Sequence, residues 1–124
     1  MSVSSKRLSV TRTMERVPRL EVVTVTGREC VRLELRGELD VATVPALMGR
    51  LLEAERAGAE LVVLDMHDVT LLDAAGLRVF LDAARRAQLH RRRFALARPD
   101  RETTRVLRLT GLDQAIEVLG QTPP

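Results

Sequence analysis

The chain has 124 residues, of which 45% are hydrophobic, and these values indicate one globular domain rather than a disordered protein. Only two residues are aromatic, so the core must consist mainly of Leu, Val and Ala, and no aromatic platform for stacking nucleic-acid bases is expected. The single cysteine, Cys30, excludes an intrachain disulfide, and no apolar stretch approaches the roughly 20 residues that span a bilayer. We therefore expect a cytoplasmic protein without a secretory signal that binds neither membrane nor nucleic acid.

The net charge of +3 is concentrated at the N-terminus. The first nineteen residues carry five basic side chains against Glu15, a charge of +4, so the remainder of the chain is close to −1. Residues 1–18 are rich in Ser, Thr and Arg, and we predict that they form a disordered basic tail, within which Met14 offers an alternative translation start. The folded domain is expected at 19–120, followed by a short C-terminal tail at 121–124.

Two strands and a helix open the predicted domain. The β-branched run at 19–27 favours a strand, and 30–37 alternates between apolar and charged side chains, as a strand with one wet face does. Amphipathic spacing then predicts a helix that is capped by Thr43 and ends at Gly58.

The middle of the chain predicts a buried strand, a helix and a second strand. A continuous apolar run at 59–66 is typical of a central strand, and Asp65 is expected to end it. The next helix is expected from Ala74 to the basic run at 90–93, with a short strand at 94–97 after it.

The last predicted elements are a helix at 100–112, capped by Asp100, and a strand at 115–118. The complete order is β-β-α-β-α-β-α-β. Strand–helix–strand units require parallel pairing and right-handed crossovers. We therefore predict an α/β fold with a small mixed β-sheet, parallel central strands and helices packed mainly on one face.

The segment LLDAAGLRVF, residues 71–80, joins the central strand to its helix. Asp73 is a suitable N-cap for a helix that begins at Ala74, and the backbone N–H groups of that first turn could receive an anion. Gly76 would leave room for the backbone of a partner protein. The simpler interpretation is a capped helix whose small residues pack against the sheet.

Three motifs occur in order along the chain: GELDVATVPAL (37–47), LVVLDMHDVTLLDAAGLRVF (61–80) and LTGLD (109–113). They resemble, respectively, the G-x-L-D-x-x-T loop, the central strand with its D-S-S/T-G-L motif, and the motif that closes the last helix of the STAS domain in bacterial anti-sigma factor antagonists. The resemblance extends over about residues 20–119 and implies a STAS-like single domain.

In that family the serine before the motif's glycine accepts phosphate from an anti-sigma factor of the serine-kinase type. The unphosphorylated antagonist binds this kinase and frees a sigma factor, and phosphorylation breaks the complex. Here Ala75 occupies the position of the phosphoacceptor, and Ala74 replaces its polar neighbour. The resemblance therefore implies a docking surface without its phosphate switch. The partner-binding residues that it implies are Asp40, Thr43, Asp73, Ala74, Ala75, Gly76 and Leu77.

Several alternatives stay open. Thr70 could replace the serine as phosphosite, although such a threonine more often bonds the backbone of a turn. Asp40 and Thr43 could serve only to cap a helix. A small-ligand or nucleotide-sensing STAS domain is the alternative function, and a weak homodimer is left open.

Enzymatic, metal and cofactor functions have little support. All serines lie in the predicted tail, so no Ser-His-Asp arrangement is expected, and His67 and His90 are too far apart in the pattern to predict a metal site. We expect neither a cofactor nor catalysis. The HRRR run at 90–93 most simply solvates a helix C-terminus, with an anion-binding patch as the alternative.

Overall fold

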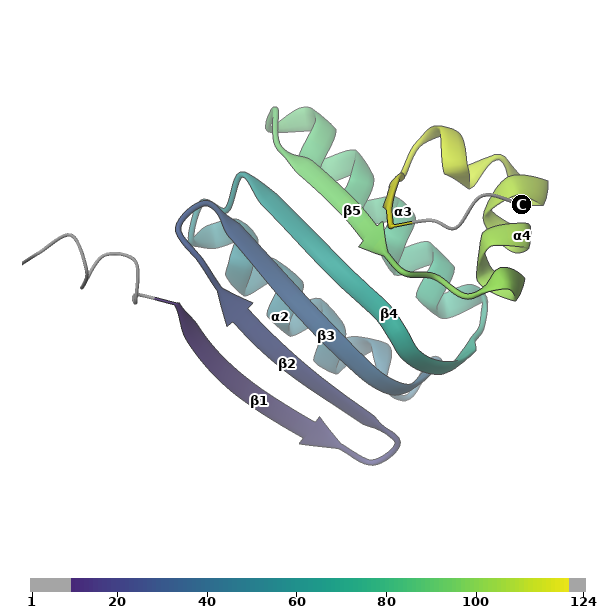
Figure 1. The fold of residues 1–124 in the computed structure, drawn as a ribbon, viewed down its shortest axis with the longest axis horizontal. Helices are drawn as coiled ribbons and strands as arrows, with labels where there is room; N and C mark the ends of the chain where they lie inside the picture. Colours follow the sequence, from purple (N-terminus) through teal and green to yellow (C-terminus); the bar gives the residue numbers. More distant parts are fainter. Residues whose placement is uncertain (1–9, 121–124) are drawn as a thin grey trace, which may run out of the picture.

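The computed structural model describes residues 10–120, which form one six-stranded sheet with helices behind it (Figure 1). The strands are β1 (Thr11–Val17), β2 (Leu20–Thr26), β3 (Cys30–Leu39), β4 (Leu61–Leu72), β5 (Arg93–Ala97) and β6 (Glu117–Leu119). The helices are α2 (Val44–Arg56), α3 (Ala74–Leu89), α4 (Arg101–Thr110) and the short 3-10 helix η1 (Leu112–Gln114). Within residues 10–120, no helix has the length and apolarity needed to cross a membrane.

The strands are arranged in chain order, β1-β2-β3-β4-β5-β6. Pairing is antiparallel from β1 to β3 and parallel from β3 to β6. Helices α2 and α3 both lie behind the sheet in Figure 1, as parallel strands joined by right-handed crossovers require. The predicted α/β fold, with a mixed sheet and its helices mainly on one face, is confirmed.

The largest departure from prediction is strand β1. This segment pairs with β2 along its whole length, so the prediction of a disordered tail is wrong for residues 11–17, and the domain begins before residue 19. The remaining parts of the two predicted tails, residues 1–9 and 121–124, lie outside the described residues.

Strand β1 was not predicted because it is held mainly by pairing with β2 and by polar side-chain contacts, while Val17 packs against the core. On the sheet face away from the helices, Arg12 binds Glu34 and Arg16 binds Glu21, each at 2.9 Å. On the other face, the carboxylate of Glu15 accepts a hydrogen bond from Arg50 of α2 at 2.9 Å. A strand stabilised in this way has no alternating apolar pattern for the sequence to display.

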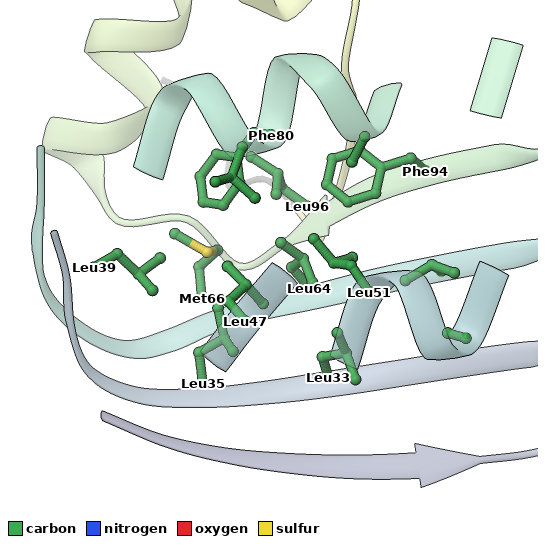
Figure 2. Packing of buried hydrophobic residues seen from close by; sticks show 14 of the residues in the cluster. Leu33, Leu35, Leu39, Leu47, Leu51, Leu64, Met66, Phe80, Phe94 and Leu96 are labelled. Atoms are coloured by element: carbon green, nitrogen blue, oxygen red, sulfur yellow. The ribbon is translucent and has the colours of Figure 1, made fainter. Parts of the chain in front are cut away.

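The hydrophobic core fills the space between the sheet and the two helices behind it, as Figure 2 shows. Its largest fully buried side chains come mainly from β3, β4, β5, α2 and α3, and include Leu33, Leu39, Leu47, Leu51, Leu64, Met66, Phe80 and Leu96. Val22 of β2, Leu107 of α4 and Ile116 are also fully buried. The two aromatic residues, Phe80 and Phe94, both belong to it. Leu and Val supply most of the rest, as composition predicts.

Asp65 does not end the central strand, as had been predicted, because β4 continues to Leu72. It lies on the face away from the helices and is only 6% exposed. Its carboxylate accepts two hydrogen bonds from Arg98, at 2.6 and 3.2 Å. Burial raises the pKa of Asp65, but the hydrogen bonds from Arg98 and from the His67 N–H outweigh burial and hold that pKa below its ordinary value. A charged residue after an apolar run is typical of a strand end, which is why the sequence predicts one at Asp65. The burial of Asp65 inside the strand is possible because Arg98, distant in sequence, pairs with its carboxylate.

Candidate functional site

Two helix starts lie side by side where β3 and β4 end. Leu39 of β3 pairs with Leu72 of β4, so the loop that enters α2 and the turn that enters α3 leave adjacent strands. The N–H of Asp73 donates to the carbonyl oxygen of Leu39 at 3.1 Å and joins the two connections. We call residues 38–43 and 70–77 the helix-start surface.

Asp73 caps α3, as the sequence predicts. Its Oδ1 accepts hydrogen bonds from the N–H groups of Ala75 at 2.8 Å and Gly76 at 3.4 Å. This carboxylate therefore occupies the place where a helix N-terminus would bind an external anion. A phosphate arriving there would meet both a negative charge and donors that are already used.

Gly76 is required by the chain's own packing rather than by a partner's backbone. The residue is buried, and a Cβ added to it would lie 2.4 Å from Leu72 Cδ1 and 3.2 Å from Leu39 Cβ. The interpretation that this glycine leaves room for a partner is wrong, because Leu39 and Leu72 fill that room. Because Gly76 has no side chain, α3 approaches the ends of β3 and β4 closely.

Thr43 begins α2 but does not cap it in the predicted way. Its side chain makes no capping bond and is 1% exposed, so it is not available at the surface for a partner. Instead its hydroxyl donates to the carbonyl oxygen of Glu38 at 2.7 Å and accepts from the Asp40 N–H at 3.0 Å. Asp40 orders the loop before α2 instead. Its Oδ1 accepts hydrogen bonds from the N–H groups of Ala42 at 2.9 Å and Thr43 at 3.1 Å.

Asp40 is also held from outside the loop. The guanidinium of Arg19, in the turn between β1 and β2, donates to Asp40 and, at 2.9 Å, to Glu38. The hydrogen bond from Arg19 and those from the Ala42 and Thr43 N–H groups lower the pKa of Asp40 below its ordinary value, against the opposing effect of burial. Asp40 is therefore ionised at neutral pH.

The remaining predicted site residues differ in how far they reach the surface. Ala74 is exposed, whereas Ala75 and Leu77 are half-buried and pack against the core. Thr70 lies within β4 rather than on a loop, and its exposed hydroxyl donates to the carbonyl oxygen of Gly37 at 3.2 Å. This is the backbone-bonding role that the sequence favours for Thr70, although the bonded carbonyl belongs to a neighbouring strand.

Sequence reasoning missed two apolar residues of this surface. Val41 is 77% exposed in the loop before α2, and Leu71 is 46% exposed at the end of β4. A signal for each was present. Val41 is an apolar residue among loop-forming polar ones, and strand alternation requires one of the consecutive Leu71 and Leu72 to face away from the core.

The helix-start surface offers contacts rather than chemical reactivity. The Asp40 carboxylate is bonded to the loop before α2, the Asp73 carboxylate caps α3, the Thr43 hydroxyl is buried, and alanines occupy the first turn of α3. Across residues 10–120, no group of three or more His, Cys, Asp or Glu side chains is placed to hold a metal ion. What remains accessible includes the exposed side chains of Val41, Leu71 and Ala74.

Comparison with known proteins identifies related sequences and folds. The family model of the STAS domain matches residues 21–122. No curated protein matches the sequence.

Several solved structures share the fold. An anti-sigma factor antagonist from Mycobacterium paratuberculosis is 21% identical, with a TM-score of 0.68, and the match covers 91% of this chain and 87% of that one. The anti-sigma factor antagonist SpoIIAA in its unphosphorylated form is 18% identical, with a TM-score of 0.64 and 90% coverage of both chains. The phosphorylated form of the Bacillus cell fate determinant SpoIIAA is 20% identical, with a TM-score of 0.63 and coverages of 90% and 93%. At these identities the similarity concerns the fold alone.

Proposed function

Because the chain belongs to the STAS domain family, we propose that it is a regulatory anti-sigma factor antagonist and not an enzyme. In this proposal it binds an anti-sigma factor of the serine-kinase type in the cytoplasm and so frees a sigma factor. The single observation that carries the proposal is the helix-start surface, which joins two helix starts and displays the exposed apolar side chains of Val41 and Leu71.

The exposure of Val41 and Leu71 supports a role in protein binding. Isolated exposed apolar side chains are ordinary, but these two belong to adjacent connections at one end of the sheet, beside the exposed Ala74. Removal of apolar surface from water is the dominant favourable contribution to most protein–protein association. Val41, Leu71 and Ala74 are therefore the residues that we place at the centre of the contact, with Asp40 and Asp73 beside them.

We further propose that Ala75 stands where related antagonists carry their phosphoacceptor. SpoIIAA is known in unphosphorylated and phosphorylated forms. Ala75 has no hydroxyl, so this chain would remain in its partner-binding form. A phosphate there would add about 1.5–2 negative charges beside the Asp73 carboxylate, which would oppose a dry contact through repulsion and desolvation.

Binding of serine-kinase-type anti-sigma factors from the same organism, measured by titration calorimetry, tests the proposal. Ala75→Glu is expected to weaken binding at least about tenfold, because it places a charge in the contact, which corresponds to roughly 1.4 kcal/mol. Ala115→Glu, the same substitution at an exposed alanine outside the helix-start surface, should leave the affinity unchanged, and circular dichroism checks that the variant at the half-buried Ala75 is folded. Equal affinities for the wild type and Ala75→Glu would show that this surface is not the interface.

Treatment with the kinase tests whether this chain has lost the phosphorylation site of the proposed docking surface. Intact mass after incubation with the kinase and ATP should show no phosphate on the wild type and one phosphate on Ala75→Ser. Phosphate on Thr70 of the wild type would mean that the switch had moved by a few residues rather than been lost.

The alternative of nucleotide sensing at the same helix start is disfavoured by Asp73, whose carboxylate already takes the N–H groups of Ala75 and Gly76. If ATP or GTP nevertheless raised the melting temperature of the wild type and not that of Ala75→Glu, this alternative would replace the proposal.

A further inference from the structure

A separate hollow lies at the opposite end of the sheet from the helix-start surface. It forms where α2 and α3 end and β5 begins, and its volume is about 380 Å³. Its floor is apolar and includes Val62, Ala83 and Phe94, which are buried. Its rim carries the arginines Arg56, Arg86, Arg92 and Arg93. Small-molecule sites are typically lined by apolar side chains together with a few polar or charged groups that orient the ligand.

The arginines of the rim are only partly neutralised. Glu55 accepts two hydrogen bonds from Arg86, at 2.8 and 3.0 Å, and Glu117 binds Arg93. Among residues 10–120, neither Arg56 nor Arg92 has a carboxylate partner within 4.0 Å. Four guanidinium groups against two carboxylates leave a charge of +2 around the mouth of the hollow.

Helix geometry explains part of this arrangement. Arg56 and Arg86 lie in the last turns of α2 and α3, where the helix dipole favours cations, and Arg92 donates to the carbonyl oxygen of Glu55 at 2.7 Å. These effects account for the presence of arginines at the helix ends. They do not account for the hollow that lies between those arginines, whose floor includes the apolar side chains of Val62, Ala83 and Phe94.

We propose that this hollow binds an anionic amphiphile, with a carboxylate or phosphate head group at the arginines and an aliphatic body over Val62, Ala83 and Phe94. Guanidinium groups bind both head groups through paired, charge-assisted hydrogen bonds. The volume lies at the lower end of the range of about 300–1,000 Å³ for small-molecule sites, which suits a short aliphatic body. Phe94 is buried in the floor of the hollow, so its ring offers little face for stacking a nucleotide base, and the exposed His90 adds an imidazole to the lining.

Three probes of matched length test this site on the full chain: octanoate, octyl phosphate and 1-octanol. Binding is followed by titration calorimetry and by backbone amide chemical shifts. Octanoate, octyl phosphate or both should bind and shift the amides of residues around the hollow, and comparison of the two identifies the preferred head group. The neutral 1-octanol should bind at least about tenfold more weakly, because it lacks the charge that the arginines recognise.

Two variants locate the site, with a matched control. Arg56→Gln removes an exposed charge at the mouth and should weaken octanoate binding about fivefold, the effect of losing roughly 1 kcal/mol. Ala87→Leu extends a half-buried side chain into the hollow and should abolish binding. Arg105→Gln, a change of the same type on α4, should have no effect.

Circular dichroism and melting temperatures establish that each variant is folded, and Arg56→Gln keeps the test valid if Ala87→Leu does not fold. The proposal is overturned if neither anionic probe binds at millimolar concentration, or if 1-octanol binds as tightly as octanoate. It is also overturned if Arg105→Gln weakens binding as much as Arg56→Gln, or if the amide shifts centre on the helix-start surface.

Discussion

The start of helix α2 is held by a network of polar side chains, whereas the start of α3 depends on the Asp73 carboxylate and on Gly76, which has no side chain. Arg19, Asp40 and Thr43 hold the loop before α2 through hydrogen bonds that reach from the β1–β2 turn to the end of β3. In contrast, α3 needs the Asp73 carboxylate at its cap and the close approach of Gly76 to the sheet.

This difference separates positions that maintain the fold from positions that present a surface. A substitution in the α2 network removes partners that lie far away in sequence, so it should disturb the whole connection. Ala74, in the first turn of α3, is exposed, and the neighbouring Ala75 is half-buried. Small substitutions at these two positions should therefore change what the surface presents more than they change the fold. The following predictions test this contrast in order of decreasing expected effect.

Gly37→Ala should have the largest effect, a loss of about 3 kcal/mol or more in the free energy of unfolding. Gly37 has φ of 123°, and an added Cβ would lie 2.1 Å from the backbone carbonyl oxygen of Arg19, which also accepts the Glu38 N–H. Gly49→Ala is the control. Gly49 lies in the middle of α2, where an added Cβ would meet no atom outside its own helix backbone within 4 Å, so this change should instead stabilise the protein by up to about 1 kcal/mol. Urea denaturation of both variants measures the difference, and equal values would contradict the assigned backbone geometry.

Thr43→Val should lower the free energy of unfolding by about 2 kcal/mol, because the isosteric side chain leaves the Glu38 carbonyl oxygen and the Asp40 N–H without their partner in a buried place. Thr43→Ser, which retains the hydroxyl, should lose less. If valine and serine proved equally tolerated, the α2 network would not be what stabilises this loop.

Gly76→Ala should cost about 1.5 kcal/mol, less than the change at Gly37, because the closest atom is the movable end of the Leu72 side chain rather than backbone. Ala75→Ser, one residue earlier, is the matched surface change and should leave the melting temperature nearly unaltered. A larger loss for Ala75→Ser than for Gly76→Ala would reverse the assignment of surface and packing positions in α3.

Asp73→Ala should cost about 1 kcal/mol through loss of the α3 cap, whereas Asp73→Asn should retain most of the stability. Thermal unfolding of the two variants at neutral pH distinguishes capping from a purely electrostatic effect. An asparagine variant as unstable as the alanine variant would show that charge, not the hydrogen bonds to Ala75 and Gly76, stabilises this end of the helix.

The smallest expected effect is a pH dependence at the start of α2. Because the folded-state pKa of Asp40 lies below its unfolded value, near 3.9, its ion pair with Arg19 stabilises the protein above that pH and is lost as the pH falls through the folded-state pKa. The difference in melting temperature between the wild type and Asp40→Asn should therefore be greatest near neutral pH and shrink below about pH 4. A constant difference from pH 7 to pH 3 would contradict this role of the ion pair.

Much of the fold could be predicted because its determinants are local. The alternation through Leu33 and Leu35 predicts β3, and the spacing of Leu47 and Leu51 predicts α2. The prediction that Asp73 caps α3 was also correct, because an N-cap depends only on residues within one turn of it.

The remaining features depend on residues that the chain brings together only after folding. Arg98 makes the burial of Asp65 possible, and Arg19 holds Asp40, yet neither pairing follows from local sequence. Ion pairs likewise hold β1 in place of an apolar pattern. In the helix-start surface, the same limitation hid the burial of Thr43 and the true neighbours of Gly76.

Strand β1 has a consequence for solubility. If the chain were shortened to begin at residue 19, β2 would become the edge of the sheet, and its N–H and C=O groups, now bonded to β1, would be open to another molecule. The sequence of β2, LEVVTVT, is β-branched and carries one charge, a composition prone to intermolecular β-pairing. Strand β1, with two arginines and a glutamate among seven residues, covers this edge with charge and so protects the domain against aggregation.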